Sequence, residues 1–247
     1  MIKIKLPEYV NIHWQKKGFK NKVKHLIAPS FESEFKFIST HRSYSIVESE
    51  GKRYCFTCNK NVIPDEFEYV LLTDYKTTEE TLIRGEFKFK KWLKHPLNKW
   101  YSVDEISDSW KDNFYFIEED EKQLRKGLRE PQIAALYSIL SHLKVSDNIG
   151  TVVMPTGTGK TETMLTTLIA NLCNRVLVIV PSESLRNQIS KKFISLGLLK
   201  QFGIVDKSVL YPKVGIIYEN FKENEELIEF MQECNVIITT MKILANS

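Results

Sequence analysis

Residues 149–163 constrain the fold of this chain more than any other segment, because an apolar run leads through a glycine-rich turn into a helix-forming stretch. The apolar run predicts a strand at residues 151–154. Gly157 and Gly159 allow the backbone to curl so that successive N–H groups converge on one point. Because helix N-termini carry partial positive charge, the segment predicts a phosphate site at the end of a buried strand.

The same segment follows the pattern Gly-x-x-x-x-Gly-Lys-[Ser/Thr], except that Met154 takes the first glycine position. In such a loop Lys160 neutralises triphosphate oxygens and Thr161 offers a hydroxyl to Mg²⁺. We therefore assign the catalytic roles of the loop to Lys160 and Thr161, with Thr161 as the Mg²⁺ ligand. The expected cofactor-binding residues of the loop are Pro155, Thr156, Gly157, Thr158, Gly159, Lys160, Thr161 and Glu162.

Strands and helices are expected to alternate through the second half of the chain. Apolar residues recur at helical spacing from Pro131, and later apolar runs are short and continuous. Strands covered by helices on both faces show such runs, so the pattern predicts an α/β domain with a parallel sheet. We expect helices at about 160–173, 184–196 and 222–233, and strands at 176–180, 213–218 and 235–239.

The first 115 residues are predicted to be β-rich. Apolar and polar residues alternate in several short runs, and Glu50-Gly51 is typical of a hairpin turn. The expected strands are 34–40, 43–47, 52–56, 67–72, 86–90 and 100–106. The predicted organisation is a β-rich accessory domain at 1–115, followed by a partial α/β lobe at 116–247.

Composition limits the class of protein. The chain has 247 residues, 43% hydrophobic and 27% charged, which is typical of a soluble globular protein. Its apolar runs are too short to span a bilayer and no leader opens the chain, so we expect a cytoplasmic protein with no membrane partner. Four cysteines predict no disulfide framework at this length.

A basic segment lies near the N-terminus. All of the net charge of +4 falls within residues 1–115, and it is densest between Lys16 and Lys24, around Phe19. Lysines beside aromatic rings are typical of surfaces that bind nucleic acid, so nucleic acid is one predicted partner. The alternative is a solvated basic segment that binds nothing.

Other polar residues surround the glycine-rich turn in sequence. Gln132 has an amide that can pair with an adenine edge, which would favour ATP over GTP. Ser182 follows a predicted strand and opens a predicted helix, so it can cap that helix beside a second phosphate site. Thr239 and Thr240 end another predicted strand. The alternatives are an exposed helix residue at Gln132, a simple cap at Ser182, and a plain strand end at the two threonines.

These elements together resemble motifs of the superfamily-two helicases and translocases. The resemblance rests on Leu128-Arg-Glu-Pro-Gln132, on the loop from Met154 to Thr161, on Val180-Pro-Ser182 with Gln188, and on Ile238-Thr-Thr240. The Leu-Arg-x-x-Gln form is similar to the branch that contains restriction-enzyme motor subunits. The resemblance implies a RecA-like lobe, ATP with Mg²⁺, and a nucleic-acid partner, with DNA favoured over RNA.

The family's residue roles transfer to matching positions. The resemblance implies that Gln132, with Arg129, reads adenine. It also implies nucleic-acid contacts from Pro181, Ser182, Gln188, Thr239 and Thr240. Restriction or antiviral defence follows only by analogy with the branch.

Hydrolysis in this family needs an Asp-Glu pair after a later strand, and residues 161–247 contain no such pair. We therefore expect the N-terminal part of a larger motor, with negligible ATP hydrolysis by this chain alone. The alternative is a non-catalytic ATP-sensing module that docks a protein partner through residues 1–115. A different phosphate-loop enzyme, such as a small-molecule kinase, is a third possibility.

Cys55 and Cys58 form a C-x-x-C pair at the end of a predicted strand. Such a pair is half of a zinc ribbon, so Zn²⁺ is a candidate ligand. No second half is evident in the sequence. Two reduced cysteines on a hairpin are the simpler interpretation.

Overall fold

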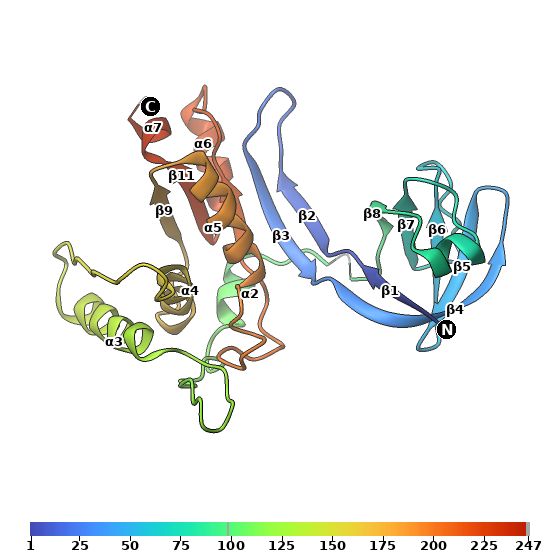
Figure 1. Cartoon of the computed structure of the whole chain (residues 1–247). Helices are drawn as coiled ribbons and strands as arrows, with labels where there is room; N and C mark the ends of the chain where they lie inside the picture. The colour runs from blue at the N-terminus through green and yellow to red at the C-terminus, as the bar shows by residue number, and fades with distance from the viewer. Residues whose placement is uncertain (98, 246–247) are drawn as a thin grey trace. The chain divides into compact units, whose positions relative to one another are not determined.

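The computed structural model describes residues 1–97 and 99–245, and the chain divides into two units (Figure 1). The first unit contains Met1–Val10 and Ile27–Trp100, and the second contains Asn11–Leu26 and Tyr101–Ser247. This differs from the predicted boundary at residue 115, because an N-terminal hairpin and residues 101–115 pack with the α/β part. The mixed α/β class with a β-rich N-terminal region is confirmed.

The first unit is a six-stranded sheet with a short helix, α1 (Glu79–Arg84). Neighbouring strands are antiparallel except for the parallel pair β6–β7. A tight turn with positive φ at Glu50 (49°) and Gly51 (73°) joins β5 to β6, as the sequence predicted. In sheet order the strands are β1 (Ile2–Leu6), β4 (Phe31–Thr40), β5 (Tyr44–Ser49), β6 (Lys52–Thr57), β7 (Tyr69–Thr73) and β8 (Phe89–Lys94).

Both faces of the central strands of this sheet are buried. One face packs Phe35, Phe56 and Leu71 against Leu82 of α1. The other face buries Cys55 in a second apolar cluster. Because apolar side chains leave water on both faces, the first unit has a core of its own.

The second unit is built on a five-stranded sheet in the order β2-β3-β10-β11-β9. The strands β10, β11 and β9 run parallel, and β3 runs antiparallel to β10. The strand bounds are β2 (Tyr9–Trp14), β3 (Lys22–Ala28), β9 (Val176–Val180), β10 (Lys213–Ile216) and β11 (Val236–Thr240). The helices are α2 (Val103–Asp108), α3 (Glu130–Val145), α4 (Lys160–Ala170), α5 (Glu183–Ser195), α6 (Asn224–Gln232) and α7 (Met241–Leu244).

The hairpin β2–β3 extends this sheet, and the sequence analysis missed it. Asn21, which is fully buried, accepts hydrogen bonds from the backbone N–H groups of Tyr218 (2.7 Å) and Glu219 (3.1 Å). Trp14 packs edge-on against Phe230 with ring centroids 5.1 Å apart. These contacts tie a segment from the start of the chain to the α/β sheet.

Two predicted strands are absent. Residues 100–106 were expected to form a strand. Instead Ser102 caps α2 and Glu105 completes a capping box, and this local capping stabilises a helix there. Residues 151–154 lie outside every strand, and Val153 is 89% exposed. Strand β9 is an edge of the sheet, but residues 151–154 pair with neither β9 nor any other described strand.

The parallel core is otherwise close to the prediction. The strands at 176–180 and 235–239 and the helices at 184–196 and 222–233 agree with β9, β11, α5 and α6 to within two residues. No helix among residues 1–97 and 99–245 combines the length and apolar character needed to cross a membrane.

Candidate functional site

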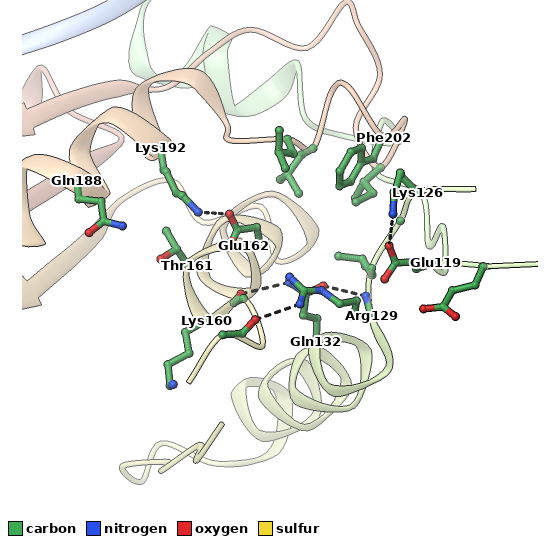
Figure 2. A pocket seen from close by; sticks show the side chains of 18 residues that line it. Glu119, Lys126, Arg129, Gln132, Lys160, Thr161, Glu162, Gln188, Lys192 and Phe202 are labelled. Atoms are coloured by element: carbon green, nitrogen blue, oxygen red, sulfur yellow. Dashed lines mark hydrogen bonds and ion pairs between the residues drawn. The ribbon is translucent and has the colours of Figure 1, made fainter. Parts of the chain in front are cut away.

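The glycine-rich turn leads directly into α4 and forms one end of a cavity of about 910 Å³ (Figure 2). Gly157 and Gly159 have φ of 83° and 92°, a conformation that side-chain-bearing residues rarely adopt. Lys160 is the first residue of α4. The first N–H groups of a helix have no acceptor within the helix, so this turn presents donors and partial positive charge to the cavity.

Two polar side chains of the turn fold back onto its own backbone. Lys160 donates from Nζ to the carbonyl oxygen of Pro155 over 2.9 Å, and Thr158 donates from Oγ1 to the same oxygen over 2.8 Å. Lys160 is also one of the residues that line the cavity. The ammonium is therefore bound to the backbone of its own loop, and it must leave Pro155 O before it can contact a ligand.

Met154, which replaces the first glycine of the motif, is 9% exposed. Its sulfur lies 3.7 Å from the hydroxyl of Thr163, which also donates to Gly159 O over 3.3 Å. The methionine thus contacts the first turn of α4. Its side chain is accommodated by burial beside Thr163.

Gln132 and Arg129 connect the start of α3 to the glycine-rich turn. Gln132 is 3% exposed; its Oε1 accepts from the Arg129 N–H over 2.8 Å, and its Nε2 donates to Gly159 O over 3.3 Å. Arg129 donates from Nη1 to Gly157 O over 3.0 Å. Each of these two amide atoms can make one further hydrogen bond, so the paired contact with adenine that we expected from Gln132 stays a prediction. The alternative of an exposed helix residue is wrong.

The opposite side of the cavity is formed by α5. Gln188 and Lys192 lie one helical turn apart and both line the cavity, and Lys192 pairs with Glu162 in the first turn of α4. Figure 2 shows Lys192 directed towards Glu162, with Thr161 nearby. Gln188, expected on nucleic acid, is thus placed on the wall of this cavity. The sequence analysis missed Lys192, although its spacing from Gln188 places both on one face of a helix.

The other residues expected to contact nucleic acid lie where β9 and β11 end. Thr240 is paired with Val180 in the sheet, so both strands end at one edge. Pro181 and Ser182 are exposed there, and Ser182 caps α5 by accepting from the Leu185 N–H over 3.2 Å. Thr239 and Thr240 are only 0% and 3% exposed. Strand pairing and helix packing cover both residues, and their contact with nucleic-acid phosphates stays a prediction.

The two cysteines of the C-x-x-C pair differ in environment. Cys55 faces the core of the first unit, and burial raises the pKa of its thiol to about 12. Cys58 is exposed, with Sγ 3.6 Å from Ser43 O. Across the described residues no group of three or more His, Cys, Asp or Glu is arranged to hold a metal ion. The geometry supports two separate thiols instead of half a zinc site.

Two histidines of the N-terminal hairpin, the half-buried His13 of β2 and the buried His25 of β3, lie close together away from the cavity. The rings of His13 and His25 are 5.3 Å apart, next to the ion pair of Lys213 and Glu233 (3.2 Å). Burial, with the charge of Lys213, lowers the pKa of His13 to about 4; burial, His13 and Lys213 lower that of His25 to about 3. These rings are neutral core groups that stabilise the hairpin.

The comparisons with known proteins identify the part of the chain that carries this cavity. Residues 125–247 match the family described as "Type III restriction enzyme, res subunit". Residues 125–247 form a superfamily-two motor domain. Neither the curated proteins nor the solved structures include a match to the chain.

The match confirms the resemblance drawn from residues 128–241. A motor domain of this family is an ATP-dependent, helicase-like component, and its members typically use ATP and Mg²⁺. The glycine-rich turn and α5 lie within the matched residues, as do all the residues that line the cavity except Glu119 and Glu121. The first unit lies outside the match.

Proposed function

We propose that this chain is the ATP-binding part of a nucleic-acid helicase or translocase, with DNA as the favoured partner. The observation that carries the proposal is the turn at Gly157 and Gly159, which leads into α4 beside a cavity of about 910 Å³. Backbone donors and a helix N-terminus face that cavity, and Lys160 is among the residues that line it. This is the arrangement that a triphosphate requires.

The residues present fit ATP with Mg²⁺. Lys160 would contact the terminal phosphates after releasing Pro155 O, and Thr161, which also lines the cavity, would bind Mg²⁺ through its hydroxyl. Position 159 requires glycine for the close approach of Gln132 to the loop, because a Cβ there would lie 2.1 Å from Gln132 Nε2. Bound Mg²⁺ would supply charge neutralisation at the phosphates.

Hydrolysis of ATP needs a carboxylate that can orient the attacking water. The residues of the cavity are better suited to binding ATP than to hydrolysing it. Glu162 is the acidic side chain nearest to Lys160 in sequence, and it is engaged by Lys192. The Asp-Glu pair on which the family relies does not occur between Thr161 and Ser247. We therefore propose that hydrolysis depends on residues outside this chain, supplied by a longer protein or a partner.

Nucleic acid is proposed to pass along the edge where β9 and β11 end. Pro181 and Ser182 are exposed at that edge, and the N-terminus of α5 gives it partial positive charge. DNA is favoured over RNA because Leu128, Arg129 and Gln132 follow the form of the restriction-enzyme branch. The first unit is proposed to bind nucleic acid or a protein partner.

Steady-state ATP turnover tests this proposal. We expect the purified chain to bind ATP-Mg²⁺ but to turn over negligibly, with or without single-stranded DNA or RNA. A longer protein that contains the Asp-Glu pair should show turnover stimulated by DNA. Turnover that needs only a small-molecule acceptor would instead identify a kinase-like enzyme, and Lys160-dependent turnover by the 247-residue chain would contradict the binding-only assignment.

A further inference from the structure

The loop that joins β2 to β3, residues 15–21, lies at the edge where the parallel strands of the second unit end. Lys22, the first residue of β3, pairs with Ile216, the last residue of β10. Strand β11 runs parallel to β10 and ends in Thr240, which α7 follows directly. Figure 1 shows the loop at the same end of this unit as α7. The hairpin therefore brings a segment from outside the family match to the edge along which nucleic acid is proposed to pass.

Hydrogen bonds and aromatic packing fix this loop in place. The Lys20 backbone N–H donates to Glu219 Oε1 over 2.7 Å, and Asn21 Nδ2 donates to the Glu219 carbonyl oxygen over 2.9 Å. The rings of Phe19 and Trp14 pack edge-on, with their centroids 6.4 Å apart. Trp14 is buried. This ring of the basic segment therefore anchors the hairpin and offers no face on which a base could stack.

Three lysines of the hairpin, which we call the hairpin patch, remain open to an external partner: Lys17, Lys20 and Lys22. Lys17 and Lys20 are exposed, and Lys22 is half-buried. Within residues 1–97 and 99–245, none of their three ammonium groups forms an ion pair. Lys16 differs, because it pairs with two glutamates of α6 at 2.9 and 3.6 Å. The acidic start of α6 is thus offset by Lys16, and the hairpin patch keeps its positive charge.

Side chains around Tyr218 connect the hairpin patch with the start of α5. The Lys22 ammonium lies 5.5 Å from the centroid of the Tyr218 ring, and the Arg186 guanidinium lies 4.3 Å from the same centroid. Arg186 lies in the first turn of α5, which Ser182 caps, and it is 2% exposed. The carboxylate that pairs with it belongs to the exposed Glu183 and is 4.0 Å away. A buried cation with so distant a counterion adds positive potential between α5 and the hairpin.

We propose that the hairpin patch binds the phosphates of a nucleic-acid strand that lies along the ends of the parallel strands. This inference rests on the proposed function and deepens it, because it adds a contact with that partner outside residues 125–247. Lysine ammonium groups on flexible stems contact phosphates as point charges and do not read bases. The hairpin patch should therefore raise the affinity for every strand by the same factor, whatever its bases or sugar.

Fluorescence anisotropy with labelled oligo(dT), oligo(dC) and oligo(U) of one length, at several salt concentrations, tests the hairpin patch on the whole chain. On a single strand, each phosphate contact contributes about 0.7 to the slope of log affinity against log salt. The triple variant Lys17→Gln, Lys20→Gln, Lys22→Gln should lower this slope by about 2, which is a loss of about a hundredfold at about 0.1 M salt. The loss should be equal for the three oligonucleotides, and ATP affinity should not change.

Two further variants control for charge and for folding. Lys52→Gln, Lys60→Gln, Lys76→Gln removes the same charge from exposed lysines of the first unit and should leave the slope unchanged. Arginine at the three positions of the hairpin patch should keep both the affinity and the slope of the wild type.

The outcomes separate this inference from the proposed function. Equal losses in the two glutamine variants would overturn the hairpin patch, because binding would then follow net charge alone. An unchanged slope in the hairpin variant would also overturn it, and the proposed function would still stand. If the wild-type chain binds none of the three oligonucleotides, the nucleic-acid partner of the proposed function fails together with the hairpin patch.

Discussion

Gly157 and Gly159 share a left-handed backbone but differ in their surroundings, so alanine substitutions at the two positions form a matched pair. A Cβ on Gly157 would meet nothing within 4 Å, whereas a Cβ on Gly159 would lie 2.1 Å from Gln132 Nε2. Strain from an L-residue at positive φ costs about 1–2 kcal/mol at either position. Gly159→Ala must also displace the Gln132 amide, which loses two hydrogen bonds of about 1 kcal/mol each.

ATP binds the turn in one conformation, so these costs should appear as lost affinity. Gly157→Ala should weaken ATP about tenfold, and Gly159→Ala about 300-fold, for a total of about 3.5 kcal/mol. In a Gln132→Ala background Gly159→Ala should again cost only about tenfold, because the clash is gone. Calorimetric titration of the four variants and the wild type gives a coupling energy of about 2 kcal/mol. Equal losses at the two glycines, or no coupling to Gln132, would refute this reasoning.

Three further perturbations test other parts of the structure. In the folded chain the pKa of His25 is lowered to about 3. Between pH 6.5 and 3 the unfolded chain therefore binds a proton at His25 that the folded chain does not. The free energy of unfolding should fall as the pH drops through this range. Denaturant titrations should show this loss, and it should shrink in His25→Gln; an unchanged pH dependence would contradict it. Gly127→Ala should destabilise the second unit by about 2 kcal/mol or more, because its Cβ would lie 2.5 Å from Ile117 O; an unaltered denaturation midpoint would exclude this close approach. A thiol reagent should modify Cys58 rapidly and Cys55 only on unfolding, since burial raises the pKa of Cys55 to about 12; equal rates would refute the assigned environments.

The α/β alternation was predictable because each element carries a local signal. Apolar runs predicted β9 and β11, and the glycine-rich turn predicted that α4 starts at Lys160. Local patterns fail where a distant partner decides the structure. Residues 151–154 carry a strand-like run but have no neighbouring strand among those described, and β2–β3 is ordered by β10, nearly 200 residues away.

The candidate site likewise contains residues that a local motif predicts and residues that only the packing of the fold brings together. The loop residues from Pro155 to Glu162 are identifiable from sequence because their spacing is tied to phosphate chemistry. Lys192 and Phe202 reach the cavity only through the packing of α5 and the turns after it, so no motif names them. Thr239 and Thr240 carry the expected residue types, yet they are buried in the structure because burial depends on packing that a motif does not report.

The central claim is that Lys160 and the glycine-rich turn form an ATP-binding site. Its most direct test is calorimetric titration of ATP-Mg²⁺ into the wild-type chain and Lys160→Ala. We expect saturable binding with one site for the wild type and a loss of at least tenfold in Lys160→Ala, since a charge-assisted contact to phosphate contributes on the order of 1.5–3 kcal/mol. Equal ATP affinity in the two proteins would contradict the claim.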